Sequence, residues 1–449
     1  MANLDIHRFK FIGHALDGSG PFRPLVTYDS QGRPIAVSSS YLIQYPRESE
    51  SKYARRNEIA WYASPLAQVC SRFVGYLSTR QVIRDINNPL YATMADDIDG
   101  KGNSIDVFWQ QFARHAKARG SMLLLVDMPA ALAGSLQDQL QRRVAPYWTG
   151  ILPELVTDYQ IGDDGKFVYV EFSGNFTQGD KRIDCTWRFD REGWAAYDNS
   201  RVPLAQGEHN LSECPVLIFT EGGDFPHFGP FAPIADISRR LFNLDSELDE
   251  ILRSQTFSLL TMQVSENSTD AQKIQAAQVV GETIGASNLM VHSGSTPAFI
   301  APPDGPAKIY MERIAALRDQ INDLGLVVGG SSQRESGLAL QMRFQALNGA
   351  LAYFASRMED LERRAWELSR QWLGLTQVPD IYWSRDYNMA DVAAEMTILA
   401  DMQATNMPTE VVTEQQRRIV SVQFAGLEQE RQEQIQAAIG ERTLEVQAQ

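Results

Sequence analysis

Three things are scarce in this chain: long hydrophobic runs, basic residues in excess, and cysteine. Hydrophobic residues make up 44% of its 449 residues, yet none of its apolar stretches reaches the roughly 18 residues that a membrane-spanning helix needs. The residues after Met1 show neither the basic nor the apolar region of a signal peptide. We therefore expect a protein that acts away from membranes and starts in the cytoplasm of the cell that makes it.

The three cysteines, Cys70, Cys185 and Cys214, lie far apart in the sequence, each among apolar neighbours. Such a pattern favours reduced thiols in a core over a disulfide framework or a zinc site. The six histidines are scattered as well.

Sequence motifs that carry chemistry are also lacking. The chain has no phosphate-binding Gly-x4-Gly-Lys-Ser/Thr loop, no Gly-x-Ser-x-Gly elbow, no His-Glu-x2-His pair and no Cys-x2-Cys pair. We expect no catalytic residue, no metal site and no cofactor, and thus a protein that is not an enzyme. An active site assembled from distant residues is the alternative.

Charge excludes one further class of protein. Lys and Arg number 41 against 56 Asp and Glu, which gives a net charge of -15. A protein that binds nucleic acid tightly does so by neutralising phosphates with basic side chains. The excess of acidic residues argues against a protein of this class. The same balance is compatible with a surface past which nucleic acid slides.

What the sequence does contain is strong helical periodicity from residue 236 onwards. A first helix is predicted from Asp236 to about Leu260, and a second follows Pro306, a residue favoured in the first turn of a helix. Each has one apolar stripe and one charged face. The stripes comprise Ile237, Leu241, Leu244, Leu248 and Ile251 in the first helix, and Ile314, Leu317, Ile321, Leu324 and Val328 in the second.

A third helix is predicted from Ser336 to Leu373, which at 1.5 Å per residue would span roughly 55 Å. A helix of this length must lie along partner helices, either in the same chain or in neighbouring subunits. The small and polar residues that precede it favour a short flexible loop over a packed corner. Its stripe comprises Leu347, Leu351, Phe354, Met358, Leu361, Ala365, Leu368 and Trp372.

The remaining segments predict a mixed α+β protein. The first fifty residues are rich in Gly, Pro and Ser and suggest an extended irregular arm. A helix is expected from Glu58 to Leu77 with a kink at Pro65, and a buried strand from Ser121 to Asp127. Residues 151–220 have a β pattern. A short strand over 380–383 and a polar helical tail complete the chain.

An acidic turn over residues 96–104 has some of the spacing of a calcium loop. With Gly100 as the sixth position, Asp97, Asp99 and Asp106 fall at positions three, five and twelve. Position one is Ala95, which cannot bind the ion. We interpret the segment as a turn that leads into a helix.

Several short segments, taken in order, resemble the portal (head-to-tail connector) proteins of tailed bacteriophages, the rings through which DNA enters the capsid. The resemblance covers most of the chain and implies a mainly helical α+β fold assembled as a ring. It is carried by Tyr53 to Arg56 in a helix that reaches Gly75, Asp97 to Gly100 before Ile105 to Phe108, Gly120 to Asp127, Cys214 to Phe219, Asp236 to Ser238 with Leu244, and Ser336 to Leu340.

The resemblance also implies a division of the chain into functional parts. In order these are an N-terminal arm (1–50), a mixed α/β wing (51–230), a first stem helix (231–262), a small α/β clip (263–305), a second stem helix (306–328), a tunnel loop (329–335), a long wing helix with a strand (336–388) and a short helical crown (389–449).

Within these parts, the tunnel loop would face the DNA. Its members are Gly329, Gly330, Ser331, Ser332, Gln333, Arg334 and Glu335. Arg334 is our first candidate for a phosphate contact, and Lys308, Arg313 and Arg318 of the second stem helix are candidates for lining the channel. The alternative for each basic side chain is an ion pair with an acidic neighbour. The loop read alone could also cradle a phosphate, although it follows no strand.

The implied partners follow from the same resemblance. They are other copies of the chain in a ring of about twelve, double-stranded DNA, the terminase large subunit, the head-tail adaptor or tail proteins, the major capsid protein and a scaffold protein. The implied location is the portal vertex of the virion, after assembly in the host cytoplasm. About twelve copies at -15 each would carry about -180 charges and repel a passing duplex. A scaffold or adaptor without a channel, or an enzyme with a dispersed site, remains an alternative.

Overall fold

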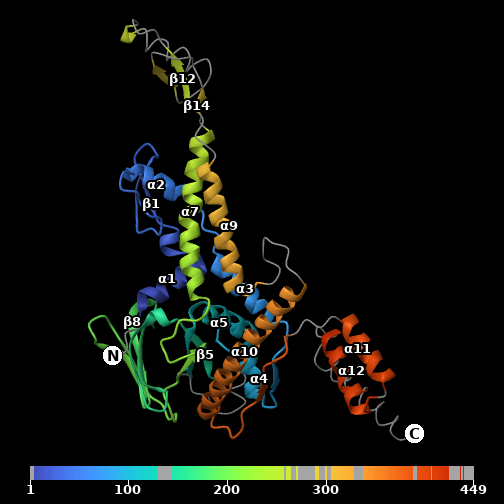
Figure 1. The fold of residues 1–449 in the computed structure, drawn as a ribbon. Coiled ribbons are helices and arrows are strands. Elements are labelled where there is room, and N and C mark those ends of the chain that lie inside the picture. The colour runs from blue at the N-terminus through green and yellow to red at the C-terminus, as the bar shows by residue number, and fades with distance from the viewer. Residues whose placement is uncertain are drawn as a thin grey trace.

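The computed structural model describes residues 5–129, 144–256, 259–263, 269–271, 289–292, 299–300, 305–327, 337–387, 392–405, 407–423, 435 and 438. Figure 1 shows a body of helices and sheets from which two long helices, α7 (Ala232–Thr256) and α9 (Gly305–Leu324), project side by side. The strands β12 (Leu259–Gln263) and β14 (Phe299–Ile300) lie at their far end. We call α7 and α9 together the stem.

The N-terminal segment differs from the irregular arm expected for it. It begins with α1 (Ile6–Asp17), continues through the paired strands β1 (Val26–Tyr28) and β2 (Pro34–Val37), and leads into α2 (Glu50–Ile59). Asp5 caps α1 by accepting a hydrogen bond from the backbone N–H of Arg8. Ile12 and Leu16 are fully buried in the main core. The expectation was wrong because it was based on the Gly and Pro residues that follow residue 17. The helical spacing of the apolar residues within 6–17 was overlooked.

Pro65 does not kink a helix, as was expected, but begins one. The chain forms α2 and then α3 (Pro65–Leu77), separated by five residues without helical structure. Ser64 before it adopts a left-handed conformation with φ of 47°. Proline suits the first turn of a helix because its missing N–H would have no helical partner there.

Two antiparallel sheets build the β-rich part of the body. One has the order β11-β4-β5 and the other the order β10-β9-β8-β7-β6. The predicted strand at residues 121–127 and the β pattern of residues 151–220 are confirmed. The bounds are β4 (Ser121–Asp127), β5 (Tyr147–Ile151), β6 (Val156–Ile161), β7 (Phe167–Gln178), β8 (Lys181–Asp190), β9 (Gly193–Tyr197), β10 (Pro203–Glu208) and β11 (Val216–Thr220).

The strand β4 is buried on both faces because it separates two cores. Leu124 and Val126 belong to the large core with the helices, whereas Leu123 and Leu125 belong to a smaller core against the second sheet. Successive side chains of a strand point to opposite faces of the sheet, so a continuous apolar run is what this position requires.

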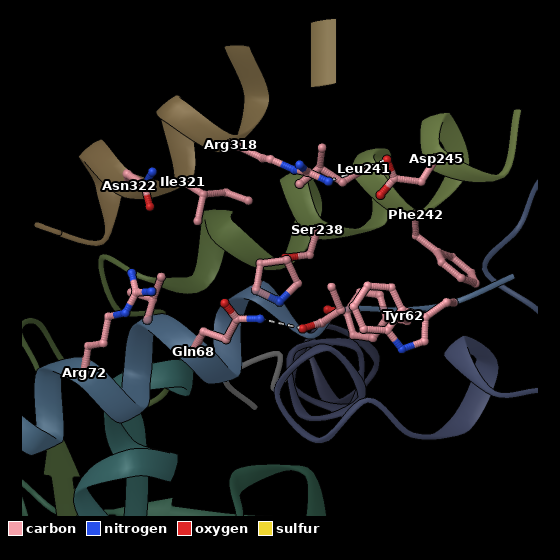
Figure 2. A pocket seen from close by; sticks show the side chains of 14 residues that line it. Tyr62, Gln68, Arg72, Ser238, Leu241, Phe242, Asp245, Arg318, Ile321 and Asn322 are labelled. Atoms are coloured by element: carbon pink, nitrogen blue, oxygen red, sulfur yellow. Dashed lines mark hydrogen bonds and ion pairs between the residues drawn. The ribbon is translucent and has the colours of Figure 1, made fainter. Parts of the chain in front are cut away.

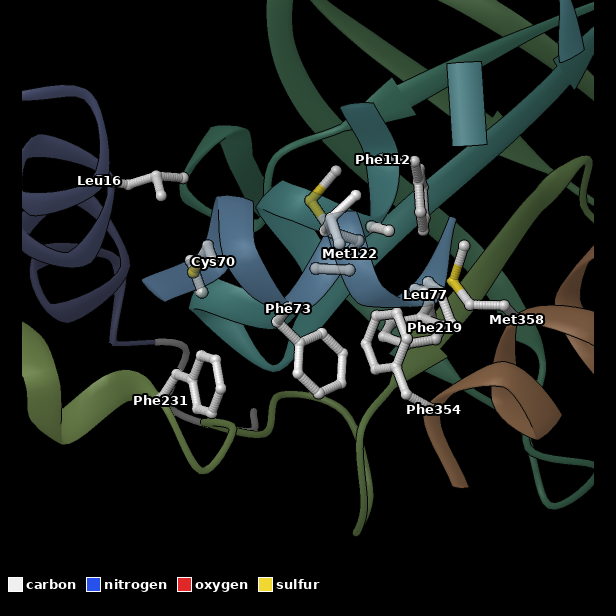
Figure 3. Packing of buried hydrophobic residues seen from close by; sticks show 14 of the residues in the cluster. Leu16, Cys70, Phe73, Leu77, Phe112, Met122, Phe219, Phe231, Phe354 and Met358 are labelled. Atoms are coloured by element: carbon white, nitrogen blue, oxygen red, sulfur yellow. The ribbon is translucent and has the colours of Figure 1, made fainter. Parts of the chain in front are cut away.

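The long helix α10 (Gly337–Leu373) lies across the body and buries its predicted stripe there. Phe354, Met358, Ala365 and Leu368 are fully buried, and the helix contacts α3, β4 and β11. Figure 3 shows Phe354 of α10 beside Phe73 of α3. Residues 347–368 therefore find their partners within the chain, which is the first of the two arrangements left open by the sequence.

The acidic turn and the cysteines are as predicted. Asp97 accepts a hydrogen bond from the backbone N–H of Gly102, and Asp99 accepts one from Lys101. The turn connects α4 (Pro89–Asp96) to α5 (Ile105–Arg119). Cys70, Cys185 and Cys214 are buried free thiols.

The remaining elements close the body and extend from it. The predicted strand near residue 380 is β15 (Asp380–Tyr382), which pairs with β3 (Ile83–Asp85). At the far end of the stem, β12 pairs in parallel with β13 (Leu289–His292) and antiparallel with β14. The short helices η1 (Gly20–Phe22) and η2 (Pro153–Leu155) join elements of the body, and α11 (Val392–Ala404) and α12 (Thr409–Gln423) pack on each other near the C-terminus.

Candidate functional site

The stem is the candidate site, because it leaves the body and keeps large apolar side chains exposed on both of its helices. Its two helices run in opposite directions, since α7 leads to β12 and α9 returns from β14 (Figure 1). The predicted stripes meet between them: Ile237 and Leu241 of α7 and Leu317 and Ile321 of α9 are at most 7% exposed and belong to the large core.

The N-terminal segment fastens α7 to the body. The guanidinium of Arg8 donates two hydrogen bonds, of 2.7 and 2.5 Å, to the carboxylate of Asp236. Further along α7, the amide of Asn243 accepts from the backbone N–H of Ile43 and donates to the carbonyl of Tyr41. These contacts hold α7 by polar groups that are spaced along two of its turns.

A buried arginine extends this attachment. Arg56 is 1% exposed and donates through Nε and Nη2 to the carboxylate of Glu48, at 2.9 and 2.8 Å. Its Nη1 lies 3.5 Å from the hydroxyl of Ser246 on α7. Such bidentate pairs fix geometry as well as charge.

One carboxylate of α7 links the segment to α9. The hydrogen bond with Glu247 raises the pKa of Tyr310 on α9. Burial, followed by a hydrogen bond to the same Glu247, raises the pKa of Tyr45. Glu247 therefore joins both tyrosine hydroxyls on one side of the stem.

The other side of the stem carries a hollow of about 330 Å³ between α3, α7 and α9. Figure 2 shows Asp245 of α7 and Arg318 of α9 at its upper edge, with Gln68 and Arg72 of α3 below. The ion pair of Asp245 with Arg318 is loose, at 3.9 Å. Trp61, which is 76% exposed, also lines the hollow.

Electrostatics distinguish Asp245 from an ordinary surface carboxylate. Burial raises its pKa; Arg318 opposes this shift and Asp249 adds to it. A carboxylate in this position is stabilised by additional positive charge.

The three basic residues predicted to line a channel do not share one face of α9. Successive residues of a helix rotate by about 100°, so residues five apart, such as Lys308 and Arg313, differ by about 140°. The buried side chains of α9 mark the side toward α7, and Arg313 and Arg318 fall on either side of that direction. Lys308 points away from α7 and is exposed. Whether any of them faces DNA stays a prediction.

The predicted tunnel loop, Gly329 to Glu335 with Arg334, lies outside the described residues. Described chain ends at Val327 and resumes with Gly337 at the start of α10. Its contact with DNA stays a prediction.

Sequence reasoning missed the polar contacts of the N-terminal segment. Arg8 and Asp236 are 228 residues apart in the sequence. No local pattern marks such a pair. The only available signal was the run of charged residues in 47–58, which includes Arg56 and Glu48.

Two kinds of feature are absent from the described residues. No group of three or more His, Cys, Asp or Glu side chains there could hold a metal ion. Among the helices in the described part of the chain, none combines the length and apolar character needed to cross a membrane.

Comparison with known proteins identifies similar structures but no sequence family. No family model matches the chain, and no curated protein matches it. A chain in the virion of a native gene transfer agent particle is 11% identical with a TM-score of 0.46, covering 89% of this chain and 96% of that one.

Two further similar chains come from the neck of the gene transfer agent particle. One, in the neck of an empty particle computed with C6 symmetry, is 11% identical with a TM-score of 0.46, covering 77% of this chain and 87% of that one. The other, in the neck of a native particle computed with C12 symmetry, is 9% identical with a TM-score of 0.46. The match covers 79% of this chain and 89% of that one.

Proposed function

We propose that this chain is a phage-type portal protein. Copies of it form a ring at one capsid vertex, and double-stranded DNA passes through the central channel during packaging and ejection. The clip at the far end of the stem docks the terminase motor and later the tail or adaptor proteins. The ring belongs to the virion and is assembled in the host cytoplasm together with the major capsid protein and a scaffold protein.

The observation that carries this proposal is the stem itself. A pair of helices that leaves the body, bears strands at its far end and keeps exposed apolar side chains is unusual for a monomer. Ile309 and Met311 of α9 are 66% and 58% exposed, and Leu252 of α7 is 44% exposed. Side-by-side copies would cover such residues and line a channel.

Charge supports a channel that lets DNA slide. The second stem helix carries three basic and three acidic residues, so a wall built from it is close to neutral. The chain as a whole has a net charge of -15, which repels a duplex from the ring surface. Individual basic side chains would then make the contacts with DNA phosphates. Arg334 is our first candidate for such a contact, and the further candidates are Lys308, Arg313 and Arg318.

Electron microscopy of the purified full-length chain tests the proposal directly. We expect rings with a central hole. Particles without a hole would contradict the channel and favour the alternative of a scaffold or adaptor in the virion. No observation specifically favours the other alternative, an enzyme with a dispersed site.

The contact of the tunnel loop with DNA has a separate test. Virus particles that carry Arg334→Ala are expected to package DNA more slowly, because one phosphate contact per copy is lost. The matched control is Arg334→Lys, which keeps the charge. Genomes of normal length packaged at the normal rate by the Arg334→Ala particles would contradict a role for Arg334.

A further inference from the structure

The two sides of the stem differ in chemistry. On one side, Ile309 and Arg313 of α9 form a short ridge, because residues four apart share a face of a helix. Ile309 is 66% exposed, and Arg313 is exposed and makes no ion pair with the residues that the structure describes. We call these two residues the ridge.

The opposite side combines carboxylates and apolar side chains with Arg318. Asp245, Asp249 and Leu252 follow one another along α7 at spacings of four and three, and Met311 of α9 lies seven residues before Arg318 on the same face. Leu252 is 44% and Met311 58% exposed. We call Asp245, Asp249, Leu252 and Met311 the groove; Asp245 also lines the hollow of Figure 2.

Ridge and groove face opposite ways on the same molecule. Arg318 belongs to the groove side, since it lies 3.9 Å from Asp245. Arg313 is rotated from Arg318 by about 140°, and the side toward α7 lies between them. A single copy therefore cannot bring its ridge to its own groove.

Ridge and groove also lie at the same level along the stem. The pair of Asp245 with Arg318 sets the register of the two antiparallel helices. Asp249 lies about 6 Å from Asp245 along α7, and Arg313 lies about 7.5 Å from Arg318 along α9 in the same direction. Copies related by rotation about a ring axis are not displaced along it, so the ridge of one copy meets the groove of the next.

We propose that the ridge of each copy docks into the groove of the adjacent copy, with Arg313 paired to Asp249 and Ile309 packed against Leu252 and Met311. This inference rests on the proposed ring. The occupant of the groove is a second copy of this chain, because the groove offers two carboxylates beside apolar side chains and the ridge offers one arginine beside an apolar side chain. The contact is head-to-tail, and only such a contact closes a ring of many copies.

Cross-linking tests the contact in the full-length chain. The pair Arg313→Cys and Asp249→Cys in one chain is treated with a short bismaleimide, because an arginine–aspartate pair separates its Cβ atoms more than a disulfide allows. We expect a ladder of covalent dimers, trimers and larger species. The native thiols are buried. Chains with one substitution, and the pair Glu312→Cys with Asp249→Cys, are expected to give no ladder.

Charge reversal gives a second, independent readout. Arg313→Glu is expected to raise the protein concentration needed for assembly by about tenfold, and Arg313→Glu with Asp249→Arg is expected to restore it. Glu312→Lys is the matched control, since it reverses a charge one residue away on a different face. If the double variant assembles no better than Arg313→Glu, the pairing is wrong.

The failure of this contact is distinguishable from the failure of the proposed function. Wild-type rings without a cross-linked ladder would overturn the docking of ridge into groove and leave the ring standing. A wild-type chain that forms no ring would overturn both.

Discussion

In the body, α10 buries Phe354, Met358 and Trp366 completely against the rest of its own chain, whereas in the stem, α9 leaves Ile309 and Met311 more than half exposed. The polar groups differ in the same way. Glu362 of α10 is fully buried and accepts hydrogen bonds from Arg84 at 2.6 Å and from the indole of Trp383 at 2.8 Å. No described residue lies within ion-pair distance of Arg313 of α9.

The difference indicates two kinds of stability. In the body, the apolar side chains of the large core pack on one another, and buried charges such as Glu362 and Lys117 have partners within the chain. We therefore expect the body to fold without a partner. In the stem, α7 and α9 bury the stripes that face each other, and the N-terminal segment covers a further part of α7. Other apolar side chains of both helices stay exposed and are available to other molecules. Substitutions in the body should therefore change unfolding, and substitutions on the flanks of the stem should change assembly.

The largest effect is expected from the centre of the body. Trp366 is fully buried, stacks edge to face with Tyr91 and Trp148, and donates its indole N–H to Glu362. Trp366→Ala should lower the free energy of unfolding by about 4 kcal/mol, measured by urea denaturation. Tyr353→Ala on the same helix is the control, because Tyr353 is 49% exposed; its loss should stay within about 0.5 kcal/mol.

The buried ion pair of Lys117 with Glu221 should make the free energy of unfolding depend on pH. Lys117 pairs with Glu221 and lies over the rings of Phe73 and Phe231, at 4.1 and 4.4 Å. Lys117→Met removes the cation and should cost about 3 kcal/mol at neutral pH. Lys117→Arg keeps the charge and is the control.

The sign of that pH dependence follows from Glu221. Burial raises its pKa above the ordinary 4.5, while Lys117 opposes the shift. Without Lys117 the pKa rises further, and a carboxyl group with a raised pKa in the folded state loses stability as pH increases. The deficit of Lys117→Met should therefore shrink as pH falls toward 4.5. A deficit that is the same at both pH values would contradict the pairing.

The smallest effect on unfolding is expected on the stem. Ile309→Ser removes an exposed apolar side chain, so the free energy of unfolding should change by no more than about 0.5 kcal/mol. Ring assembly, followed by sedimentation, should nevertheless weaken, because the ridge loses its apolar contact. If Ile309→Ser destabilised folding and left assembly unchanged, the distinction between body and stem would fail.

Much of the fold could be predicted because the spacing of apolar residues along each helix and strand indicates which face is buried. The stripes of α7, α9 and α10 and the apolar run of β4 each reflect one repeated burial pattern, and such patterns are readable without knowing the partner. The helix over residues 6–17 was missed because Gly and Pro nearby dominated the composition of the segment. The role of Pro65 was misjudged because proline both ends and begins helices.

The candidate site was harder to predict, for a physical reason. The side on which Arg313 or Arg318 lies depends on which residues of α9 face α7, and a sequence shows only that both are basic. Contacts such as Arg8 with Asp236 join residues 228 positions apart, and chain folding alone brings them together. The same holds for the hollow beside Asp245, which three separate helices build.

The mass of the native assembly tests the central claim most directly. The chain has a mass of 50.3 kDa, so a ring of about twelve copies would have a mass of about 600 kDa. We expect native mass spectrometry of the full-length protein to give one species near that value. A mass of 50.3 kDa at every protein concentration would contradict the ring.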